Sequence, residues 1–148
     1  MKLKTLITLF ILSSIPLLAQ NTIEKKNKIK TLKDNYIAEE LHLTAEESEK
    51  FWPIYNQYSD KQFELQHVKM KQLMAKLQDD ATKKMNEKEA SSLLSQLEHI
   101  EDDLYQNKKK LNADLKSILN DSQIIKLKKT EDDFNRKLLK QYHNKKSK

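Results

Sequence analysis

Apolar side chains recur every three or four residues along most of this chain, from about Thr22 to Tyr142. An α-helix turns once in about 3.6 residues, so this spacing places the apolar side chains on one helical face. The pattern is interrupted near residues 42–44, 78–86 and 119–121. The chain is therefore predicted to be all-α, with about four helices. The apolar positions of the four predicted helices, in order, are Ile29, Leu32, Tyr36, Ile37 and Leu41; Phe51, Ile54, Tyr55, Tyr58, Leu65, Val68, Leu73 and Leu77; Ala90, Leu93, Leu94, Leu97, Ile100, Leu104, Leu111, Leu115 and Ile118; and Ile124, Leu127, Phe134, Leu138 and Tyr142.

The first interruption carries a helix-start signal, Leu43-Thr44-Ala45-Glu46-Glu47. A threonine hydroxyl before a helix accepts a hydrogen bond from the free backbone N–H three residues on. The side chain of Glu47 can accept a bond from the Thr44 N–H in return, which completes a capping box. The second helix is therefore predicted to start at Ala45.

Two further capping boxes mark the next helix starts. Asn86 and Glu89 have the required spacing before the third helix, and Asn120 and Gln123, preceded by Leu119, have it before the fourth. The second helix contains Pro53, which removes one backbone hydrogen bond and presses on the preceding turn. A kink or break is expected there.

The second and third helices each have room for roughly 33 residues, or roughly 50 Å at 1.5 Å per residue. A compact domain of this size would be shorter, so two such helices predict an elongated, bent helical hairpin. A thin hairpin cannot enclose all of its own apolar side chains. It must leave an apolar groove open, pair with a second copy, or do both, so a homodimer is expected.

The composition excludes several kinds of site. The sequence has no glycine and no cysteine. It therefore has no Gly-rich phosphate loop, thiolate metal site, disulfide framework or cysteine nucleophile. No serine lies in a nucleophile elbow, and no histidines are paired at helical spacing. These features predict a protein that is not an enzyme and holds no cofactor.

The N-terminus has the pattern of an export signal. Lys2 and Lys4 precede an apolar run over residues 5–18, and Ala19 supplies a small residue for cleavage. We predict a signal peptide over residues 1–19, cut after Ala19 or Gln20, and a periplasmic protein that is not inserted in the membrane. An uncleaved membrane anchor is the competing interpretation. One helical domain over residues 20–142 and a basic, disordered tail over residues 143–148 complete the expected organisation.

The charge is mild once the signal peptide is removed. Residues 20–148 carry 26 basic and 22 acidic side chains, and Arg136 is the only arginine. Nucleic-acid binding favours arginine and a one-sided basic face. No nucleic-acid partner is expected.

Two leucine-plus-cap segments and an aromatic segment carry a family resemblance. Leu43-Thr44-x-x-Glu47 and Leu119-Asn120-x-x-Gln123 resemble the two copies of the LTXXQ motif. That motif marks a periplasmic family that includes the chaperone Spy, the stress-response repressor CpxP and heavy-metal sensors. The segment Phe51-Trp52-Pro53-Ile54-Tyr55-Asn56-x-Tyr58 is similar to small exported proteins labelled sensors of extracytoplasmic-function (ECF-type) sigma factors.

The resemblance implies a bent helical hairpin that forms a cradle-shaped dimer and binds unfolded proteins or senses envelope stress. The chain departs from the motif in two places. Glu47 stands where the family has glutamine, and Asn120 stands where it has threonine. Both substitutions keep the capping chemistry.

The aromatic cluster Phe51, Trp52, Tyr55 and Tyr58 is the candidate client-binding site. Aromatic side chains bind strongly at a low cost in conformational entropy, so an exposed cluster would form a platform for client side chains. Core packing is the alternative for these residues. The lysines are candidates for a basic rim around a client, or for an ordinary solvated face: Lys69, Lys71, Lys76, Lys108, Lys109 and Lys110.

A specific metal site is not expected. The histidines are His42, His67, His99 and His143, and no two are three or four residues apart. Met70 and Met74 share a helical face that could contact copper(I), but packing is the more ordinary role of methionine. The leading hypothesis is an ATP-independent periplasmic chaperone with an apolar, lysine-rimmed surface. The alternatives are a regulatory subunit of a membrane sensor or anti-sigma factor, and a heavy-metal sensor or buffer.

Overall fold

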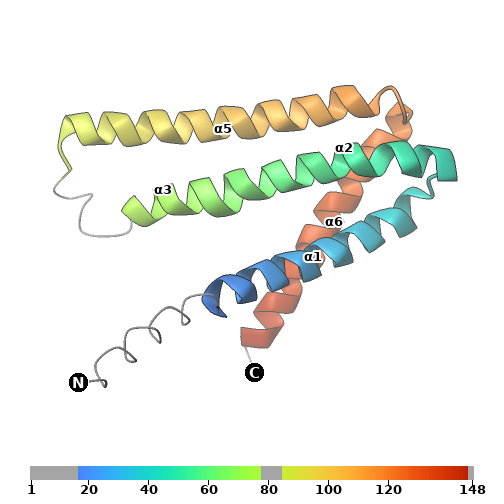
Figure 1. Cartoon of the computed structure of the whole chain (residues 1–148), viewed down its shortest axis with the longest axis horizontal. Helices are drawn as coiled ribbons and strands as arrows, with labels where there is room; N and C mark the ends of the chain where they lie inside the picture. Colours follow the sequence, from blue (N-terminus) through green and yellow to red (C-terminus); the bar gives the residue numbers. More distant parts are fainter. Residues whose placement is uncertain (1–16, 78–84, 147–148) are drawn as a thin grey trace, which may run out of the picture. The chain divides into compact units, whose positions relative to one another are not determined.

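The computed structural model describes the backbone of residues 17–77 and 85–146, and the side chains of residues 23–77 and 85–144. Every regular element in these residues is helical, so the prediction of an all-α helical hairpin is confirmed. The elements are α1 (Leu17–Leu41), α2 (Ala45–Phe63), the π-helix η1 (Glu64–Lys69), α3 (Met70–Leu77), α5 (Glu87–Leu115) and α6 (Asp121–Lys146) (Figure 1).

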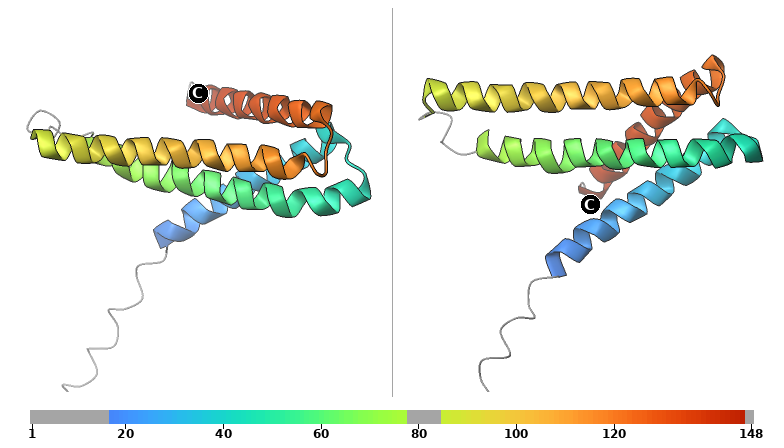
Figure 2. Two further views of the ribbon diagram at one scale, coloured as in Figure 1. Left: turned by 90° about the horizontal axis from the view of Figure 1, so that it is seen from above. Right: turned by 45° about the horizontal axis from the view of Figure 1, so that its top comes forward.

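The chain divides into two compact units. The hairpin unit is Leu43–Lys126, and the terminal unit combines the described residues up to His42 with those from Leu127 onward. In the hairpin unit, α2, η1 and α3 follow one another as a first arm, and α5 packs along them as the second arm (Figures 1 and 2).

A single row of buried apolar side chains joins the two arms. The row follows the apolar stripes that predicted the helices. On both arms most remaining side chains are half-buried or exposed, because a two-helix hairpin has no third layer to cover them. The buried members are Phe51, Tyr55, Tyr58, Leu65 and Leu73 on the first arm and Ile100, Leu111 and Leu115 on the second.

Of the two outcomes expected at Pro53, a kink or a break, the break is wrong. Helix α2 continues without interruption from Ala45 to Phe63, and Pro53 lies on its exposed side. Phe51 and Tyr55, on either side of the proline, are fully buried. Packing of these two rings outweighs the single backbone hydrogen bond that the proline removes.

The helical pattern changes at η1 instead. The Met70 N–H bonds to the Leu65 carbonyl, five residues back, where an α-helix would use the residue four back. This wider turn takes up one extra residue. The buried positions Leu65 and Leu73 are eight residues apart, one more than the seven that fit two α-helical turns, so η1 returns Leu73 to the buried face. Val68, which was expected in the stripe, is 41% exposed.

The terminal unit contains α1 and most of α6. Lys33 Nζ lies 3.0 Å from Glu131 Oε1, and the Lys137 ammonium donates to the Tyr36 hydroxyl at 2.8 Å. The Tyr36 ring also lies 6.0 Å from Phe134. Helix α1 starts at Leu17, before the expected Thr22, and α6 reaches Lys146, four residues past the expected end of the ordered domain.

His42 ends α1 with a positive φ of 49°. Many helices end with a residue in this left-handed conformation, which is usually glycine, and this sequence has no glycine. Among the described non-glycine residues no other has a positive φ. Residues 1–16, with most of the predicted signal peptide, and residues 147–148 lie outside the described part of the chain. No helix in the described part is long and apolar enough to span a membrane.

Candidate functional site

The first motif forms the predicted capping box. The Thr44 hydroxyl accepts a hydrogen bond from the Glu47 N–H at 3.2 Å, and Glu47 Oε2 accepts one from the Thr44 N–H at 2.8 Å. Glu46 and Glu47 add negative charge at the first turn of α2, where the helix dipole is positive. The structure therefore starts α2 at Ala45, as the sequence predicts.

The other two boxes are also present. Asn120 Oδ1 accepts from the Gln123 N–H at 2.9 Å, and Gln123 Oε1 accepts from the Asn120 N–H at 2.9 Å. Asn86 and Glu89 make the equivalent pair at the start of α5. The two residues that depart from the LTXXQ motif, Glu47 and Asn120, thus keep their capping roles.

A side-chain hydrogen bond links the two motif copies. Gln123 Nε2 donates to Glu47 Oε1 at 3.0 Å, across 76 residues of sequence. Glu47 uses its other oxygen for the cap, so each carboxylate oxygen has its own donor. The bond from Gln123, followed by the bonds from Thr44, lowers the pKa of Glu47 below its ordinary value. The paired caps, Thr44–Glu47 and Asn120–Gln123, therefore join the start of α2 to the start of α6 within the hairpin unit.

The aromatic cluster is part of the core, which overturns its assignment as a client platform. Phe51 and Tyr55 have no exposed surface and stack with ring centroids 5.2 Å apart. Tyr58 is also buried, and its ring lies 5.8 Å from that of Tyr55. Trp52 is half-buried, with its indole N–H bonded to the Ser48 hydroxyl at 3.0 Å. The helical spacing places these rings on one face of α2, and that face is buried in the structure.

A polar layer interrupts the buried row. Asn107 Nδ2 donates to the Tyr58 carbonyl at 3.1 Å and to Gln62 Oε1 at 3.3 Å. Asn107 continues the α5 spacing of Leu104 and Leu111, and Gln62 continues that of Tyr58 and Leu65, so both occupy stripe positions. A polar residue in such a seam fixes the register of two helices, because a shifted register leaves it unpaired. Sequence reasoning missed this layer, although its helical spacing was visible.

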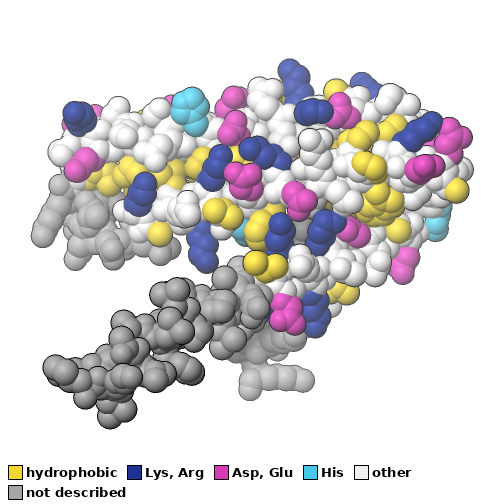
Figure 3. Space-filling model, in the orientation of Figure 1, with side chains coloured by type: hydrophobic (Ala, Val, Ile, Leu, Met, Phe, Trp, Pro, Cys, Tyr) yellow, Lys and Arg dark blue, Asp and Glu magenta, His cyan; other side chains and the backbone are white. Residues whose placement is uncertain are grey.

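The two arms enclose a groove beside this layer. One pocket of about 510 Å³ is lined by Tyr58, Asn107, Leu111 and charged neighbours, and a second of about 300 Å³ has Leu73 and Ile100 in its lining. Asp103 lines both pockets, so we treat them together as the inter-arm groove. Figure 3 shows apolar side chains reaching the surface along the hairpin unit, with charged side chains beside them. The charged lining residues are Lys61, Lys69, Lys76, Lys110, His99, Asp103 and Asp114.

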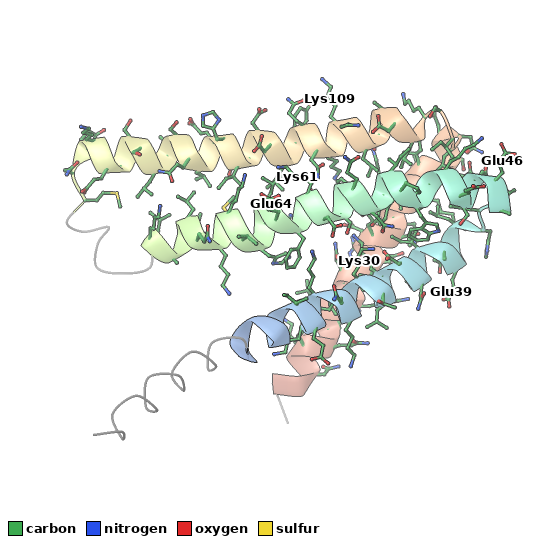
Figure 4. The ribbon with its side chains drawn as sticks, viewed as in Figure 1. Lys30, Glu39, Glu46, Lys61, Glu64 and Lys109 are labelled. Atoms are coloured by element: carbon green, nitrogen blue, oxygen red, sulfur yellow. The ribbon has the colours of Figure 1, made fainter. Side chains whose placement is uncertain are left out.

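Four lysines therefore rim the groove: Lys61, Lys69, Lys76 and Lys110. Lys61 and Lys69 approach Glu64 only to 3.9 and 3.6 Å, and all three side chains are more than 40% exposed. Lys110 pairs with Asp114, whereas Lys76 has no ion-pair partner in the described residues. In Figure 4, Lys61 lies on the side of α2 that faces α5. Exposed pairs of this kind contribute about 0–1 kcal/mol, so the lysines are available to a ligand.

The remaining predicted candidates are dispersed. Of the expected rim lysines, Lys71, Lys108 and Lys109 do not line the groove, whereas Lys69, Lys76 and Lys110 do. Within the described residues, no three histidine or carboxylate side chains are grouped as metal ligands. The chain offers hydrogen-bonding, apolar and cationic surface at the groove, which suits the binding of another chain.

Comparison with protein-family models, with curated proteins and with solved structures finds no match to this chain. The resemblance to the LTXXQ-motif family therefore rests on the capping residues and the aromatic segment, and it stays a prediction.

Proposed function

We propose that this is an exported, periplasmic protein-binding protein that holds unfolded protein chains without ATP, as a chaperone does. Its binding site is the inter-arm groove of the hairpin unit. The proposal rests on one observation: the groove combines apolar lining residues with four lysines, of which three are in exposed ion pairs and one has no ion-pair partner in the described residues. An unfolded chain presents apolar side chains, backbone polar groups and acidic residues together, and the groove matches all three.

The thin core of the hairpin supports the proposal. Helix α5 has 29 residues, of which three are buried. Large apolar side chains stay exposed in the same unit, including Val68, Leu94, Tyr105 and Ile125.

The groove lysines are expected to raise the rate at which a client binds. Long-range attraction raises the rate of encounter with an acidic segment, and salt weakens that attraction. The aliphatic stems of lysine also cover apolar surface while the ammonium groups stay in water. Client capture is therefore expected to be faster at low ionic strength, with retention dominated by apolar contact.

The test is suppression of client aggregation by the mature protein. A reduced, aggregation-prone client is mixed with stoichiometric amounts of protein at low salt, and light scattering follows aggregation. The groove variant Lys69→Glu with Lys76→Glu is compared with the control Lys71→Glu with Lys88→Glu, which changes the same charge on the same unit outside the groove. The proposal expects suppression by the wild type and the control, and a clear loss in the groove variant.

Absence of suppression by the wild type at every ratio contradicts the proposal. Capture from an envelope extract adds a second readout. Many weak partners that increase under stress agree with chaperoning, whereas one stable stoichiometric partner that resists salt assigns the groove to a regulatory complex instead.

A further inference from the structure

Helix α6 extends well past the core of the terminal unit. The last buried side chain of α6 in the described residues is Phe134. The helix nevertheless continues to Lys146, for roughly three further turns. Figure 1 shows α6 crossing α1 and continuing beyond it. We call residues 135–148 the C-terminal segment. Packing inside the terminal unit does not account for its apolar side chains, which are described below.

The C-terminal segment has charges of one sign. It contains six basic side chains and no acidic one, whereas residues 121–134 of the same helix contain three basic and four acidic side chains. The sign therefore changes along α6, and the acidic residues end at Asp133. The basic residues of the segment are Arg136, Lys137, Lys140, Lys145, Lys146 and Lys148.

The rest of the chain neutralises little of this charge. Arg136 pairs with Asp132 at 3.0 Å, but both side chains are exposed. Lys137 donates to the uncharged Tyr36 hydroxyl at 2.8 Å and lies 4.2 Å from the centre of that ring. Lys140 is exposed and has no ion-pair partner in the part of the chain that the structure describes. Positive charge is therefore presented to the surroundings.

Large apolar side chains are exposed among these cations. Leu139 is 60% exposed and Tyr142 is 53% exposed. The two residues are three apart, so they are neighbours on the helix surface. Tyr142 also continues the spacing of Phe134 and Leu138, and the sequence pattern places it in the apolar stripe. The structure leaves it uncovered, so the end of α6 combines apolar and cationic surface.

An anionic lipid surface matches this combination. Leucine and tyrosine side chains enter the boundary between lipid headgroups and acyl chains, while lysine and arginine reach the phosphates. A helix that docks in a protein groove carries apolar anchors over two or more turns. Here the exposed anchors occupy about one turn and the remaining positions are polar or charged. The pattern therefore favours a lipid surface over a protein groove.

We propose that the C-terminal segment binds the surface of membranes that contain anionic lipids. Leu139 and Tyr142 enter the headgroup boundary, and Arg136 and Lys140 contact lipid phosphates. A segment with this many charges lies on a membrane without crossing it. The proposal is independent of client binding, because the residues that line the inter-arm groove belong to the hairpin unit. Membrane binding would hold the protein beside the membrane.

The charge requirement is tested by sedimentation of the mature protein with vesicles. One set contains equal parts of phosphatidylglycerol and phosphatidylcholine, and the other contains phosphatidylcholine alone. The wild type should sediment with the anionic set at low salt and be released at about 1 M salt, where screening acts within about 3 Å. Little should sediment with the neutral set.

A matched pair of variants assigns the charge to α6. Each basic side chain near an anionic surface strengthens binding roughly fivefold, so Arg136→Gln with Lys140→Gln should weaken it roughly 25-fold. The control Lys71→Gln with Lys88→Gln makes the same charge change at exposed positions of the hairpin unit and should bind as the wild type does. Equal weakening in both variants would contradict a site on α6.

A second pair tests the apolar contribution. Leu139→Ser with Tyr142→Ser should weaken binding by at least about tenfold, because the apolar area that enters the headgroup boundary is lost. The control Leu94→Ser with Tyr105→Ser removes a similarly exposed pair from α5 and should have little effect. Circular dichroism of every variant checks that the helices are formed. Equal losses in the two variants would contradict the proposal.

Tryptophan fluorescence locates the contact. The only tryptophan is Trp52, so Trp52→Phe provides a background for Tyr142→Trp or, as the control, Tyr105→Trp. Anionic vesicles should shift the emission to shorter wavelength at position 142 and leave it unchanged at position 105. Equal shifts, or no shift at position 142 in protein that sediments with vesicles, would overturn the proposal.

Two further results would overturn it. The first is a wild type that does not sediment with anionic vesicles at low salt, or that binds neutral vesicles equally well. The second is a wild type that ignores vesicles but binds a poly-glutamate peptide through Arg136 and Lys140, which would assign the segment to an acidic protein partner instead.

Discussion

Among the described residues, the hairpin unit buries a long row of apolar side chains between its arms, whereas the terminal unit buries a smaller apolar set and adds bonds between long polar side chains of α1 and α6. The buried apolar residues of the terminal unit are Ile37, Leu41, Leu127 and Phe134. The charges differ as well. Residues 43–126 hold 13 basic and 15 acidic side chains, but residues 20–42 and 127–148 hold 13 basic and only 7 acidic ones. Both units have exposed ion pairs within one helix, such as Lys50–Glu46 and Lys129–Asp133, and the terminal unit also has the Lys33–Glu131 pair between α1 and α6.

This contrast predicts that substitutions in the two units change the free energy of unfolding by different amounts and with a different dependence on salt. Apolar burial contributes about 25 cal/mol per Å² and is not screened by salt. Exposed and half-exposed ion pairs contribute less and are screened over about 10 Å at 0.1 M salt. Substitutions should therefore cost most in the buried row of the hairpin and least among the ion pairs of the terminal unit.

The largest effect is expected at Leu65. This side chain is fully buried at the π-helix, so Leu65→Ala should lower the free energy of unfolding by about 2–5 kcal/mol. Denaturant unfolding followed by circular dichroism measures the change. Val68→Ala, three residues on and exposed, is the matched control and should change stability by less than about 1 kcal/mol. Equal costs at both positions would contradict the burial pattern around η1.

The polar layer comes next. Asn107→Ala removes two hydrogen bonds and leaves the Gln62 side chain unpaired beside the core, which should cost about 1–3 kcal/mol. The double variant Gln62→Leu with Asn107→Leu should recover much of this loss, because two apolar side chains can pack where two polar ones paired. A double-mutant cycle that shows no coupling between the two positions would contradict a stabilising contact between Asn107 and Gln62.

A smaller, pH-dependent effect is expected at Glu47. Its pKa is lowered by Gln123 and Thr44, so the ionised form stabilises the folded state. That contribution is fully present above the ordinary value of 4.5 and is lost as the pH falls through the folded-state pKa. Glu47→Gln should therefore be less stable than the wild type at pH 7. The difference should shrink as the pH falls below the ordinary value of 4.5.

Unfolding curves of both proteins at pH 7 and in acid check this prediction. If the difference in free energy of unfolding stays the same from pH 7 into acid, the negative charge of Glu47 does not stabilise the link between the two caps.

The smallest effect is expected at the Lys33–Glu131 pair of the terminal unit. Lys33→Met keeps the aliphatic stem and removes the charge, which should cost about 0–1 kcal/mol at low salt and less at 1 M salt. Thermal unfolding at the two salt concentrations measures it. A loss in free energy of unfolding as large as that caused by Leu65→Ala would contradict the difference proposed between the two units.

Local signals in the sequence predicted much of the fold. The three capping boxes and the start of α2 at Ala45 follow from residues three apart, whose interaction needs no knowledge of the rest of the chain. The π-helix was not predicted, although the eight-residue step from Leu65 to Leu73 signals it. Val68 obscured that step because it is apolar and yet exposed.

The candidate site was less predictable, because it depends on which side of each helix faces the other arm. The aromatic residues from Phe51 to Tyr58 have the same periodicity whether their face is buried or exposed, and packing against other elements decides between the two. The bond from Gln123 to Glu47 and the bond from Asn107 to Gln62 each join residues more than 40 positions apart. Only the tertiary structure brings such partners together.

The central claim is that the inter-arm groove holds unfolded chains, and client affinity tests it most directly. Fluorescence anisotropy of a labelled, permanently unfolded client is titrated with the wild type, the Lys69→Glu/Lys76→Glu variant and the Lys71→Glu/Lys88→Glu control at low salt. Two reversed rim charges at about 0.2–1 kcal/mol each predict a dissociation constant weakened by about 2-fold to about 30-fold. The control should bind as the wild type does. Equal weakening in both variants, or in neither, would contradict a client site in the groove.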